Sequence, residues 1–455
     1  MAQKPSIPKG TRDFSPTEVY KRNYLFDVIR DCFQTYGFQP IETPSFEKLE
    51  TLTGKYGEEG DRLIFKILNS GQKVKKADLD ALANGNLARF ANSLSEKALR
   101  YDLTVPFARF VVQHQNDLAF PFKRYQIQPV WRADRPQHGR FQEFYQCDAD
   151  VVGSTSLVQE VEFIQLYDEV FSTLQLKGVI IKINNRKVLS GIAEIIGASD
   201  QIVDFTVALD KLDKIGEQGV KDEMLKKGIS SASIAKALPL FSFSGSNAEK
   251  LNKLSDMLAD SEIGMEGVKE LSFVIETIEE LGLRDSKLSI DVTLARGLDY
   301  YTGAIFEVAA PEGVKMGSIG GGGRYDDLTG TFGLKDVSGV GISFGLDRIY
   351  LVLEELDLFP EALTQSLDVL FINFGELEAL QAMRMLKQLR AKGVKVELYP
   401  DAAKMKKQMT YANKRNVAKV VMIGSKELEE QTFVLKDMQT GKQTTHSLSV
   451  LDTLF

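Results

Sequence analysis

The stretch "VWRADRPQHGRFQEFYQCDADV" (residues 130–151) indicates a strand that enters a polar loop and a second strand that returns from Arg140. Alternate residues of a strand share one face. One face of the returning strand is largely apolar, with Glu143 as its exception, and comprises Phe141, Tyr145, Cys147, Ala149 and Val151. The other face is mostly polar and comprises Arg140, Gln142, Phe144, Gln146, Asp148 and Asp150.

A second segment, "LRYDLTV" (99–105), shows the same alternation. It predicts a strand with Arg100, Asp102 and Thr104 on its polar face, within a region from 98 to 151 that is predicted to be largely strands. One such strand favours a half-exposed antiparallel sheet with water on its polar side. Several of them, accompanied by glycine-rich segments, favour a lined cavity.

Two glycine-rich segments accompany these strands, "LARGLDYYTG" (294–303) and "GSIGGGGRYDDL" (317–328). The second has neither the spacing of a dinucleotide fingerprint nor the Lys-Ser/Thr ending of a P-loop. Four consecutive glycines predict a flexible turn, here before a helix-like segment that begins at Arg324 and Tyr325. Such glycines would also let a ligand approach the backbone closely.

Three arginines lie beside these segments. Arg132 follows the first strand, Arg296 opens "RGLDYY", and Arg348 falls in the first turn of a helix predicted after "VGISFG". Each one alone is typical of a surface residue or a structural ion pair. Together, at strand ends beside glycines, they suit a polyphosphate, because the planar guanidinium binds phosphate oxygens at two points.

The composition is that of a globular protein, with 455 residues, 43% of them hydrophobic and 26% charged, which predicts two or three domains. No apolar run reaches the roughly 20 residues of a membrane span, and the N-terminus has no hydrophobic signal segment, so we expect a cytoplasmic protein.

Neither the two cysteines nor the three histidines have the spacing of a metal site. No protein-built metal centre is therefore expected, and any metal is expected to be Mg²⁺ arriving with a phosphate substrate.

The net charge of −7 is unevenly distributed. Residues 365–455 carry 14 Lys/Arg and 10 Asp/Glu, a balance of +4, so the remainder carries −11. A mildly basic end on an acidic body favours a polyanion at that end, although ordinary solvated surface charge explains the pattern about as well.

The pattern of elements predicts an α+β fold. A helix is expected from the capping residue Ser15 to Gly37, with Pro16 in its first turn and Glu18 completing a capping box. Strands are expected near 288–310 and 338–345, and a helix from about 346. The segment "LFPEALTQS" (358–366) is the expected linker to a small α/β domain. The expected domains are a core at 1–357, a mainly helical insertion within it at 186–285, and a C-terminal domain at 366–455.

Several segments resemble one family. "YGFQPIETPSFE", "VWRADRPQHGRFQEFYQ" and "GVGISFGLDRIYLVL" resemble motifs 1, 2 and 3 of class II aminoacyl-tRNA synthetases. "RGLDYY" together with "GGGGRYDDL" is similar to the signature of the histidyl-tRNA synthetase family. The likeness extends from "KGTRDF" to the C-terminal α/β domain and so covers nearly the whole chain.

The resemblance implies a catalytic domain on an antiparallel six-stranded sheet, a helical insertion, a C-terminal anticodon-binding domain and a homodimer whose interface includes the region of Pro44. The implied reaction joins L-histidine to ATP as histidyl-adenylate and then transfers histidine to the 3′-hydroxyl of tRNA(His). Three alternatives are a non-catalytic paralogue acting as a histidine sensor or regulatory subunit, a class II synthetase for another amino acid, and an unrelated binding module. The arginines, the C-terminal domain and "RGLDYY" argue against them.

The resemblance also implies roles for single residues at the histidine end of the site. Asp102, Thr104 and Gln146 match the groups that contact the substrate α-amino group, whereas Asp150 and Tyr301 match those that hold the imidazole at its two nitrogens. Tyr325 is expected to help wall the histidine pocket, and Asp299 and Tyr300 are expected to play supporting roles. Asp102 and Asp150 stand where many bacterial members have glutamate.

At the ATP end, Arg132 and Arg296 match the pair flanking the α-phosphate, so both are catalytic candidates and Arg296 is the leading one. The remaining implied contacts are the outer phosphates for Arg140 and Arg348, adenine for Phe144, and ATP for Asp134, which replaces the motif 2 glutamate. Arg135 and Gln137 match loop positions that approach the tRNA acceptor end.

Overall fold

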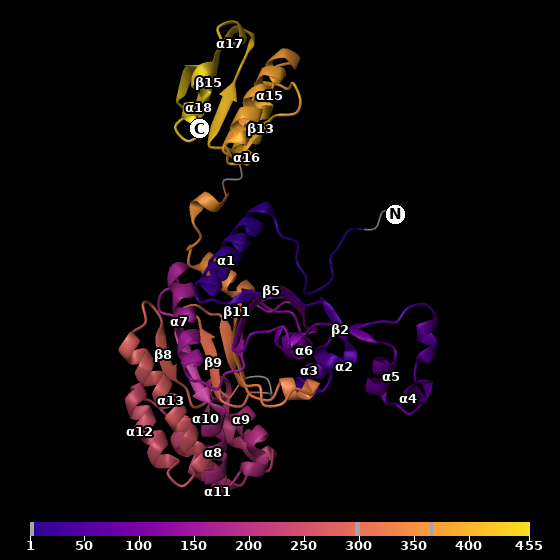
Figure 1. The fold of residues 1–455 in the computed structure, drawn as a ribbon, viewed down its shortest axis with the longest axis vertical. Coiled ribbons are helices and arrows are strands. Elements are labelled where there is room, and N and C mark those ends of the chain that lie inside the picture. Colours follow the sequence, from indigo (N-terminus) through magenta and orange to yellow (C-terminus); the bar gives the residue numbers. More distant parts are fainter. Residues whose placement is uncertain (1–3, 296–300, 365–366) are drawn as a thin grey trace. The chain divides into compact units, whose positions relative to one another are not determined.

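The computed structural model describes residues 4–295, 301–364 and 367–455 (Figure 1). The chain divides into two compact units, the first formed by Met1–Asp13 and Leu25–Leu358 and the second by Phe14–Tyr24 and Phe359–Phe455. Within the described residues, none of the helices is both long enough and apolar enough to cross a membrane.

The first unit is built on an 8-stranded sheet in the order β1-β5-β6-β11-β10-β9-β7-β8. All neighbours from β5 to β7 are antiparallel, whereas β1 and β8 pair in parallel at the two edges. The α+β prediction and its antiparallel six-stranded core are therefore confirmed, with one parallel strand added at each edge. The strands are β1 (Gln39–Pro40), β5 (Phe122–Trp131), β6 (Glu143–Val152), β7 (Ile180–Asn185), β8 (Lys287–Ile290), β9 (Ala304–Ala309), β10 (Gly320–Tyr325) and β11 (Gly339–Gly345).

The hairpin predicted from residues 130–151 is present as β5 and β6. Gln126 pairs with Asp148 and Arg124 pairs with Asp150, so these four side chains share one face of the sheet. Asp148 and Asp150 are buried, as is Cys147 on the opposite face. The polar face of β6 is thus enclosed by protein and is not the water-covered side of an exposed sheet.

The strand prediction for "LRYDLTV" is wrong beyond Leu99. Strand β4 (Lys97–Leu99) ends there, and helix α6 (Thr104–His114) begins five residues later. The backbone N–H of Val105 donates to Asp102 Oδ1 at 3.2 Å, which satisfies one of the unpaired donors of the first helical turn. Val105, Ala108 and Val111 are buried at helical spacing, so over the longer segment the helical period prevails over the alternation.

The expectation of a flexible turn at the glycine run is also wrong, and so is that of a helix starting at Arg324. The glycines form β10, a central strand between β9 and β11. A Cβ atom on Gly322 would lie 2.1 Å from the Gly341 carbonyl oxygen, which leaves no room for a side chain. The run of glycines is therefore required by the close approach of the neighbouring strand.

The predicted helical stretch is confirmed by helices that Figure 1 shows as one group, with contacts to β7 and β8. Helices α8 and α13 approach closely, since a Cβ atom on Gly191 would lie 2.5 Å from the Gly264 Cα atom. The helices are α8 (Arg186–Ile196), α9 (Ile202–Leu209), α10 (Leu212–Lys226), α11 (Ser231–Phe241), α12 (Asn247–Met257) and α13 (Glu262–Leu281).

The predicted N-terminal helix is α1 (Pro16–Thr35), and its capping box is formed by Ser15 and Glu18. A small sheet in the order β2-β4-β3 precedes α6. Its other strands are β2 (Phe46–Lys48) and β3 (Lys66–Ile67). The remaining helices that accompany the two sheets are α2 (Leu49–Leu52), α3 (Gly57–Leu63), α4 (Leu79–Ala83), α5 (Leu87–Ser93), α7 (Val158–Thr173) and α14 (Leu346–Glu355).

The second unit contains the α/β pattern predicted for the C-terminal region, on a 5-stranded sheet in the order β13-β12-β14-β15-β16. Val369 and Phe371 lie in one hydrophobic core, and Leu370 and Ile372 lie in another, so both faces of β12 are covered. The elements are β12 (Val369–Phe371), α15 (Glu376–Ala391), β13 (Val396–Leu398), α16 (Met405–Lys414), β14 (Lys419–Met422), α17 (Ser425–Glu429), β15 (Thr432–Asp437), β16 (Gln443–Ser447) and α18 (Leu451–Leu454). The sequence did not predict the antiparallel strands β15 and β16.

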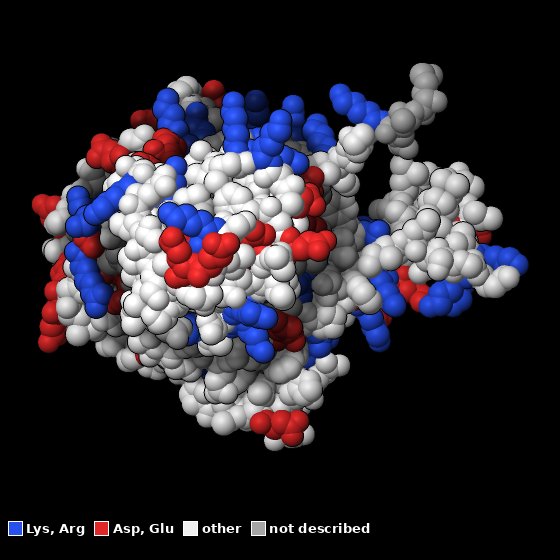
Figure 2. Space-filling view, turned by 90° about the horizontal axis from the view of Figure 1, so that it is seen from above, with Lys and Arg blue, Asp and Glu red and all other residues white. Residues whose placement is uncertain are grey.

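Charged side chains of both signs are interspersed over the face of the molecule in Figure 2. No field of a single sign covers that whole face. This mixture agrees with the ordinary composition and with the modest net charge of −7.

We expect Gly322→Ala to lower the free energy of unfolding of the first unit by about 1–3 kcal/mol, because the added methyl group would force β10 and β11 apart. Gly321→Ala is the matched control, since its Cβ atom would meet only the Phe306 carbonyl oxygen, at 3.2 Å. The measurement is urea-induced unfolding followed by the fluorescence of Trp131, the one tryptophan of the chain. Equal midpoints for the two variants would contradict the close-approach explanation.

Candidate functional site

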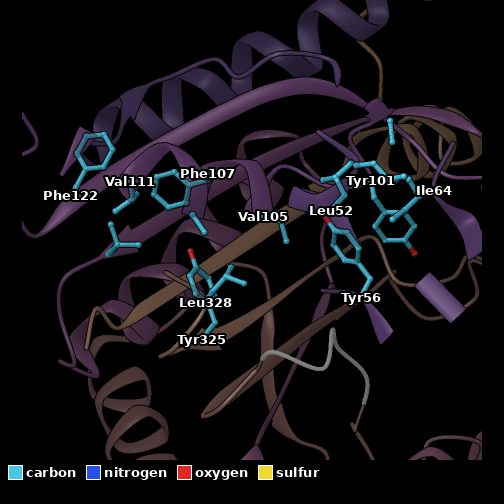
Figure 3. Close-up of a cluster of buried hydrophobic side chains, with 14 residues drawn as sticks. Leu52, Tyr56, Ile64, Tyr101, Val105, Phe107, Val111, Phe122, Tyr325 and Leu328 are labelled. Atoms are coloured by element: carbon cyan, nitrogen blue, oxygen red, sulfur yellow. The ribbon is translucent and has the colours of Figure 1, made fainter. Parts of the chain in front are cut away.

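A cavity of about 380 Å³ lies over the centre of the eight-stranded sheet. Its lining comes from β6, β9, β10 and β11, from the loop between β5 and β6, and from the start of α14. Beside it lies a hydrophobic cluster that includes Tyr56, Tyr101, Phe107 and Tyr325 (Figure 3). Asp102 follows Tyr101 in the chain and Asp150 accepts from Tyr325, so apolar packing fixes the surroundings of two carboxylates of the cavity wall.

Asp102 lies at the start of α6 and lines the cavity together with Thr104. The Tyr56 hydroxyl donates to Asp102 Oδ1 at 2.8 Å. Burial raises the pKa of Asp102, although the Tyr56 hydroxyl and Arg132 oppose that shift. A buried carboxylate of this kind favours a cationic ligand, because the ligand charge would offset the cost of desolvation.

Asp150 of β6 is almost inaccessible to solvent. Arg124 Nη2 lies 2.9 Å from Asp150 Oδ2, and the Tyr325 hydroxyl donates to Asp150 Oδ1 at 2.5 Å. Burial raises the pKa of Asp150, whereas Arg124 lowers it. The guanidinium of Arg124 also lies over the Phe107 ring, with its Cζ atom 4.2 Å from the ring centroid.

Glycines of β10 and β11 lie beneath three of these functional side chains. A Cβ atom on Gly341 would lie 2.0 Å from Asp150 Oδ1, and one on Gly339 would lie 2.2 Å from Tyr325 Cε2. A Cβ atom on Gly323 would lie 2.9 Å from Tyr301 Cδ1. These glycines therefore form a floor that leaves room for Asp150, Tyr301 and Tyr325 above the sheet.

Two arginines line the cavity in fixed orientations. Arg132 Nε donates to the Tyr101 carbonyl at 3.0 Å, and its Cζ atom lies 4.3 Å from the centroid of the Tyr101 ring. Arg348 donates from Nε to the Gly139 carbonyl at 2.9 Å and from Nη1 to the Ser318 carbonyl at 2.6 Å. These carbonyl contacts orient both guanidinium groups at the cavity wall, and oriented guanidinium groups are suited to bind phosphate oxygens.

The loop between β5 and β6 contributes further polar groups. Asp134 and Arg140 line the cavity, with 3.8 Å between Arg140 Nη1 and Asp134 Oδ1. Phe144 also lines it, with its ring centroid 5.3 Å from Arg132 Cζ. Arg135 and Gln137 are exposed in the same loop and lie outside the cavity lining.

The described residues predicted at the histidine and ATP ends line this one cavity: Asp102, Thr104, Arg132, Asp134, Arg140, Phe144, Gln146, Asp150, Tyr301, Tyr325 and Arg348. Arg296, Asp299 and Tyr300 lie outside the described residues. The roles inferred for all of these residues remain predictions.

Sequence reasoning assigned no role to Asp148, Ser343 or Asp347, which also line the cavity. Asp347 Oδ1 accepts from Arg12 Nη2 at 2.6 Å, and its Oδ2 accepts from the Tyr145 backbone N–H at 3.2 Å. Asp347 therefore holds β6 to the start of α14. The signal for Asp148 was its place on the polar face of β6, whereas nothing local indicated Asp347.

The cavity thus combines buried carboxylates with oriented arginines. This arrangement suits a ligand with a cationic, hydrogen-bonding part and a polyphosphate part. Among the described residues, no group of three or more His, Cys, Asp or Glu side chains could hold a metal ion.

Comparisons with known proteins agree with this geometry. The family model described as histidyl-tRNA synthetase matches residues 10–75 and 83–349, and the model described as anticodon binding domain matches residues 368–454. The histidine–tRNA ligase of Christiangramia forsetii is 68% identical over 98% of this chain and 97% of its own. That of Flavobacterium johnsoniae is 62% identical over 97% of each chain.

A solved structure extends the likeness to three dimensions. The histidyl-tRNA synthetase from Nostoc superposes with a TM-score of 0.82 at 33% identity, over 99% of each chain. The sequence relatives and this structure cover the first unit and the C-terminal region alike. The chain therefore belongs to the histidyl-tRNA synthetase family.

Proposed function

We propose that this protein is an ATP-dependent histidine–tRNA ligase that works through a histidyl-adenylate intermediate. The observation that carries the proposal is one cavity lined by buried carboxylates, oriented arginines and the glycines of β10 and β11. The named activity of relatives that are 68% and 62% identical supports it. The match of residues 368–454 to an anticodon-binding domain supports tRNA as the acceptor.

In the first step, histidine binds at the carboxylate end. Its α-ammonium group is placed against Asp102, Thr104 and Gln146, which offer one anionic and two neutral acceptors. Its imidazole is placed at the deeper end, between Asp150 and Tyr301. A pocket that hydrogen-bonds both ring nitrogens rejects isosteres lacking them, because their binding leaves buried polar groups unpaired.

In the second step, a carboxylate oxygen of histidine attacks the α-phosphorus of ATP, and the bond to the bridging oxygen of pyrophosphate breaks. Negative charge spreads over the α-phosphate oxygens in the transition state. We infer that Arg132 and Arg296 stabilise this charge, and that Arg348 and Arg140 hold the outer phosphates while Phe144 stacks on adenine. Preorganised cations lower the barrier because they need no reorganisation during the reaction.

In the third step, the 3′-hydroxyl of the terminal adenosine of tRNA(His) attacks the carbonyl carbon of the adenylate, and AMP leaves. The exposed Arg135 and Gln137 are placed to meet the acceptor end. Lys404, Lys406 and Lys407 are exposed at the start of α16 and could contact the phosphate backbone. The excess of basic over acidic residues in 365–455 supports this assignment.

Three further parts of the proposal concern the setting of the reaction. ATP enters as its Mg²⁺ complex, so the ion belongs to the substrate. The protein acts as a homodimer through the segment around Pro44, as the likeness to motif 1 implies. It acts in the cytoplasm, where tRNA is charged.

The alternative, a non-catalytic histidine sensor or regulatory subunit, would not need the phosphate end of the cavity. Arg132 and Arg348 are held there by backbone carbonyls, and the C-terminal anticodon-binding domain is matched over 368–454. No observation on this chain favours the alternative.

We expect ATP–pyrophosphate exchange, run with each of the twenty amino acids in turn, to respond to histidine alone. Only the histidine side chain has two ring nitrogens, one donor and one acceptor, that can form hydrogen bonds at opposite ring edges while its ammonium group contacts Asp102. Exchange with another amino acid would indicate a different synthetase. Binding of histidine without any exchange would indicate a sensor.

We expect Arg296→Ala to reduce the rate of histidine activation by about 100- to 1,000-fold, as for the loss of one preorganised group at a developing charge. The affinity for histidine, measured by calorimetry, should remain near that of the parent because the change affects only the transition state. Arg135→Ala is the control and should lower aminoacylation of tRNA but leave exchange unchanged. Equal losses of binding and rate in Arg296→Ala would mean that the residue serves binding or folding.

A further inference from the structure

Asp148 is a second buried carboxylate on the cavity face of β6, with 2% of its surface exposed. It lies between Gln146 and Asp150 on the same face of the strand. Gln126 of β5 and Ser343 of β11 are its cross-strand neighbours. From Phe144 to Asp150, this face runs from the adenine end to the imidazole end, so Asp148 borders the imidazole end.

The two neighbouring carboxylates differ in their hydrogen bonds. Asp150 accepts from the Tyr325 hydroxyl on Oδ1 and is paired with Arg124 through Oδ2. Asp148 Oδ1 is buried and has no hydrogen-bond donor among the residues that the structure describes. A buried acceptor without a donor is unfavourable, so the site is completed when a ligand supplies one.

The electrostatics of Asp148 agree with a carboxylate that gains from a further hydrogen-bond donor. Burial raises the pKa of Asp148 to about 7, against the lowering effects of Arg124 and of a hydrogen bond with the Ser343 side chain. Within the described ranges, the titratable or charged groups that face it are Arg124 of β5, Asp150 of β6, Asp102 from the segment before α6 and Tyr167 of α7. A donor from the ligand would stabilise the ionised form.

We propose that Asp148 Oδ1 accepts a hydrogen bond from the imidazole N–H of the substrate histidine, while Asp150 mainly orients Arg124 and Tyr325. This inference rests on the proposed function. It revises one contact of the proposed function: the partner of the ring N–H becomes Asp148, whose Oδ1 has no donor among the described residues, in place of Asp150. Asp148 is then a determinant of amino-acid specificity. The ammonium group stays with Asp102 and Thr104 at the start of α6.

The test compares the binding of histidine and of one histidine analogue to the parent protein and to Asp148→Asn. 4-Thiazolylalanine keeps the ammonium and carboxylate groups of histidine but has no ring N–H. Asp148→Asn should raise the dissociation constant of histidine by about 10- to 100-fold, as for a lost hydrogen bond to a charged group. The constant of thiazolylalanine should change by less than about threefold, since the interaction removed involves only the ring N–H. Equal weakening of both ligands, or of neither, would overturn the inference.

Stability provides a second readout that separates a ligand-binding role from a structural one. Because the folded pKa of Asp148 exceeds its ordinary value of 3.8, the unfolded chain releases this proton first as the pH rises. The contribution of Asp148 to stability therefore falls between about pH 4 and pH 7. Without ligand, Asp148→Asn should melt at a higher temperature than the parent at pH 8, and this difference should shrink at pH 5. A lower melting temperature at pH 8 would indicate a structural carboxylate and contradict the inference.

The control is Asp168→Asn, in a buried carboxylate that accepts backbone N–H groups of residues 284–286 and does not line the cavity. It should lower the melting temperature and leave both ligand affinities unchanged.

Asp148→Ser is the second variant if Asp148→Asn does not fold, with the same expected difference between the two ligands. If the parent fails to exchange with histidine, the proposed function is wrong; if it exchanges and Asp148→Asn binds histidine normally, only this inference is wrong.

Discussion

The site depends on glycines at particular positions of two central strands, where a side chain would not fit. β10 and β11 approach so closely that a methyl group on Gly322 would overlap the backbone of β11. On the cavity face, Gly323, Gly339 and Gly341 leave the space that Tyr301, Tyr325 and Asp150 occupy. Larger residues at these positions would fill the cavity floor. The sheet thus forms a rigid scaffold and its glycines determine where the functional side chains can lie.

This scaffold keeps charged groups out of water at fixed positions. Arg124 is fully buried and offsets Asp150, and the Tyr325 hydroxyl completes the surroundings of that carboxylate. In the same cavity, backbone carbonyls orient Arg132 and Arg348. A histidine and an ATP molecule bound in one cavity would each meet complementary charge, so binding itself brings the carboxylate of one close to the α-phosphate of the other. The proposed chemistry follows from this orientation.

The sequence predicted the parts of the fold that depend on local periodicity. The β5–β6 hairpin and the polar face of β6 follow from a period of two that continues over ten residues. In "LRYDLTV" the same alternation covers too few residues to exclude a helix. Alternation also cannot reveal the hydrogen bond from the Val105 N–H to Asp102, which helps to start α6. β10 was missed because its glycines are explained only by the neighbouring strand. The sequence predicted no role for Asp148, because it does not show that both oxygens of Asp150 already have protein partners whereas Asp148 Oδ1 has no donor among the described residues.

The most direct test of this account is the affinity for histidine, measured by isothermal titration calorimetry, after Gly341→Ala. The added methyl group would lie about where Asp150 Oδ1 now is, 2.0 Å from the ideal Cβ position. The account predicts that histidine affinity falls at least about tenfold while ATP affinity is retained, since the loss of a correctly placed buried carboxylate costs more than about 1.4 kcal/mol. Unchanged histidine affinity in a folded Gly341→Ala protein would contradict the claim that the glycine floor positions the site.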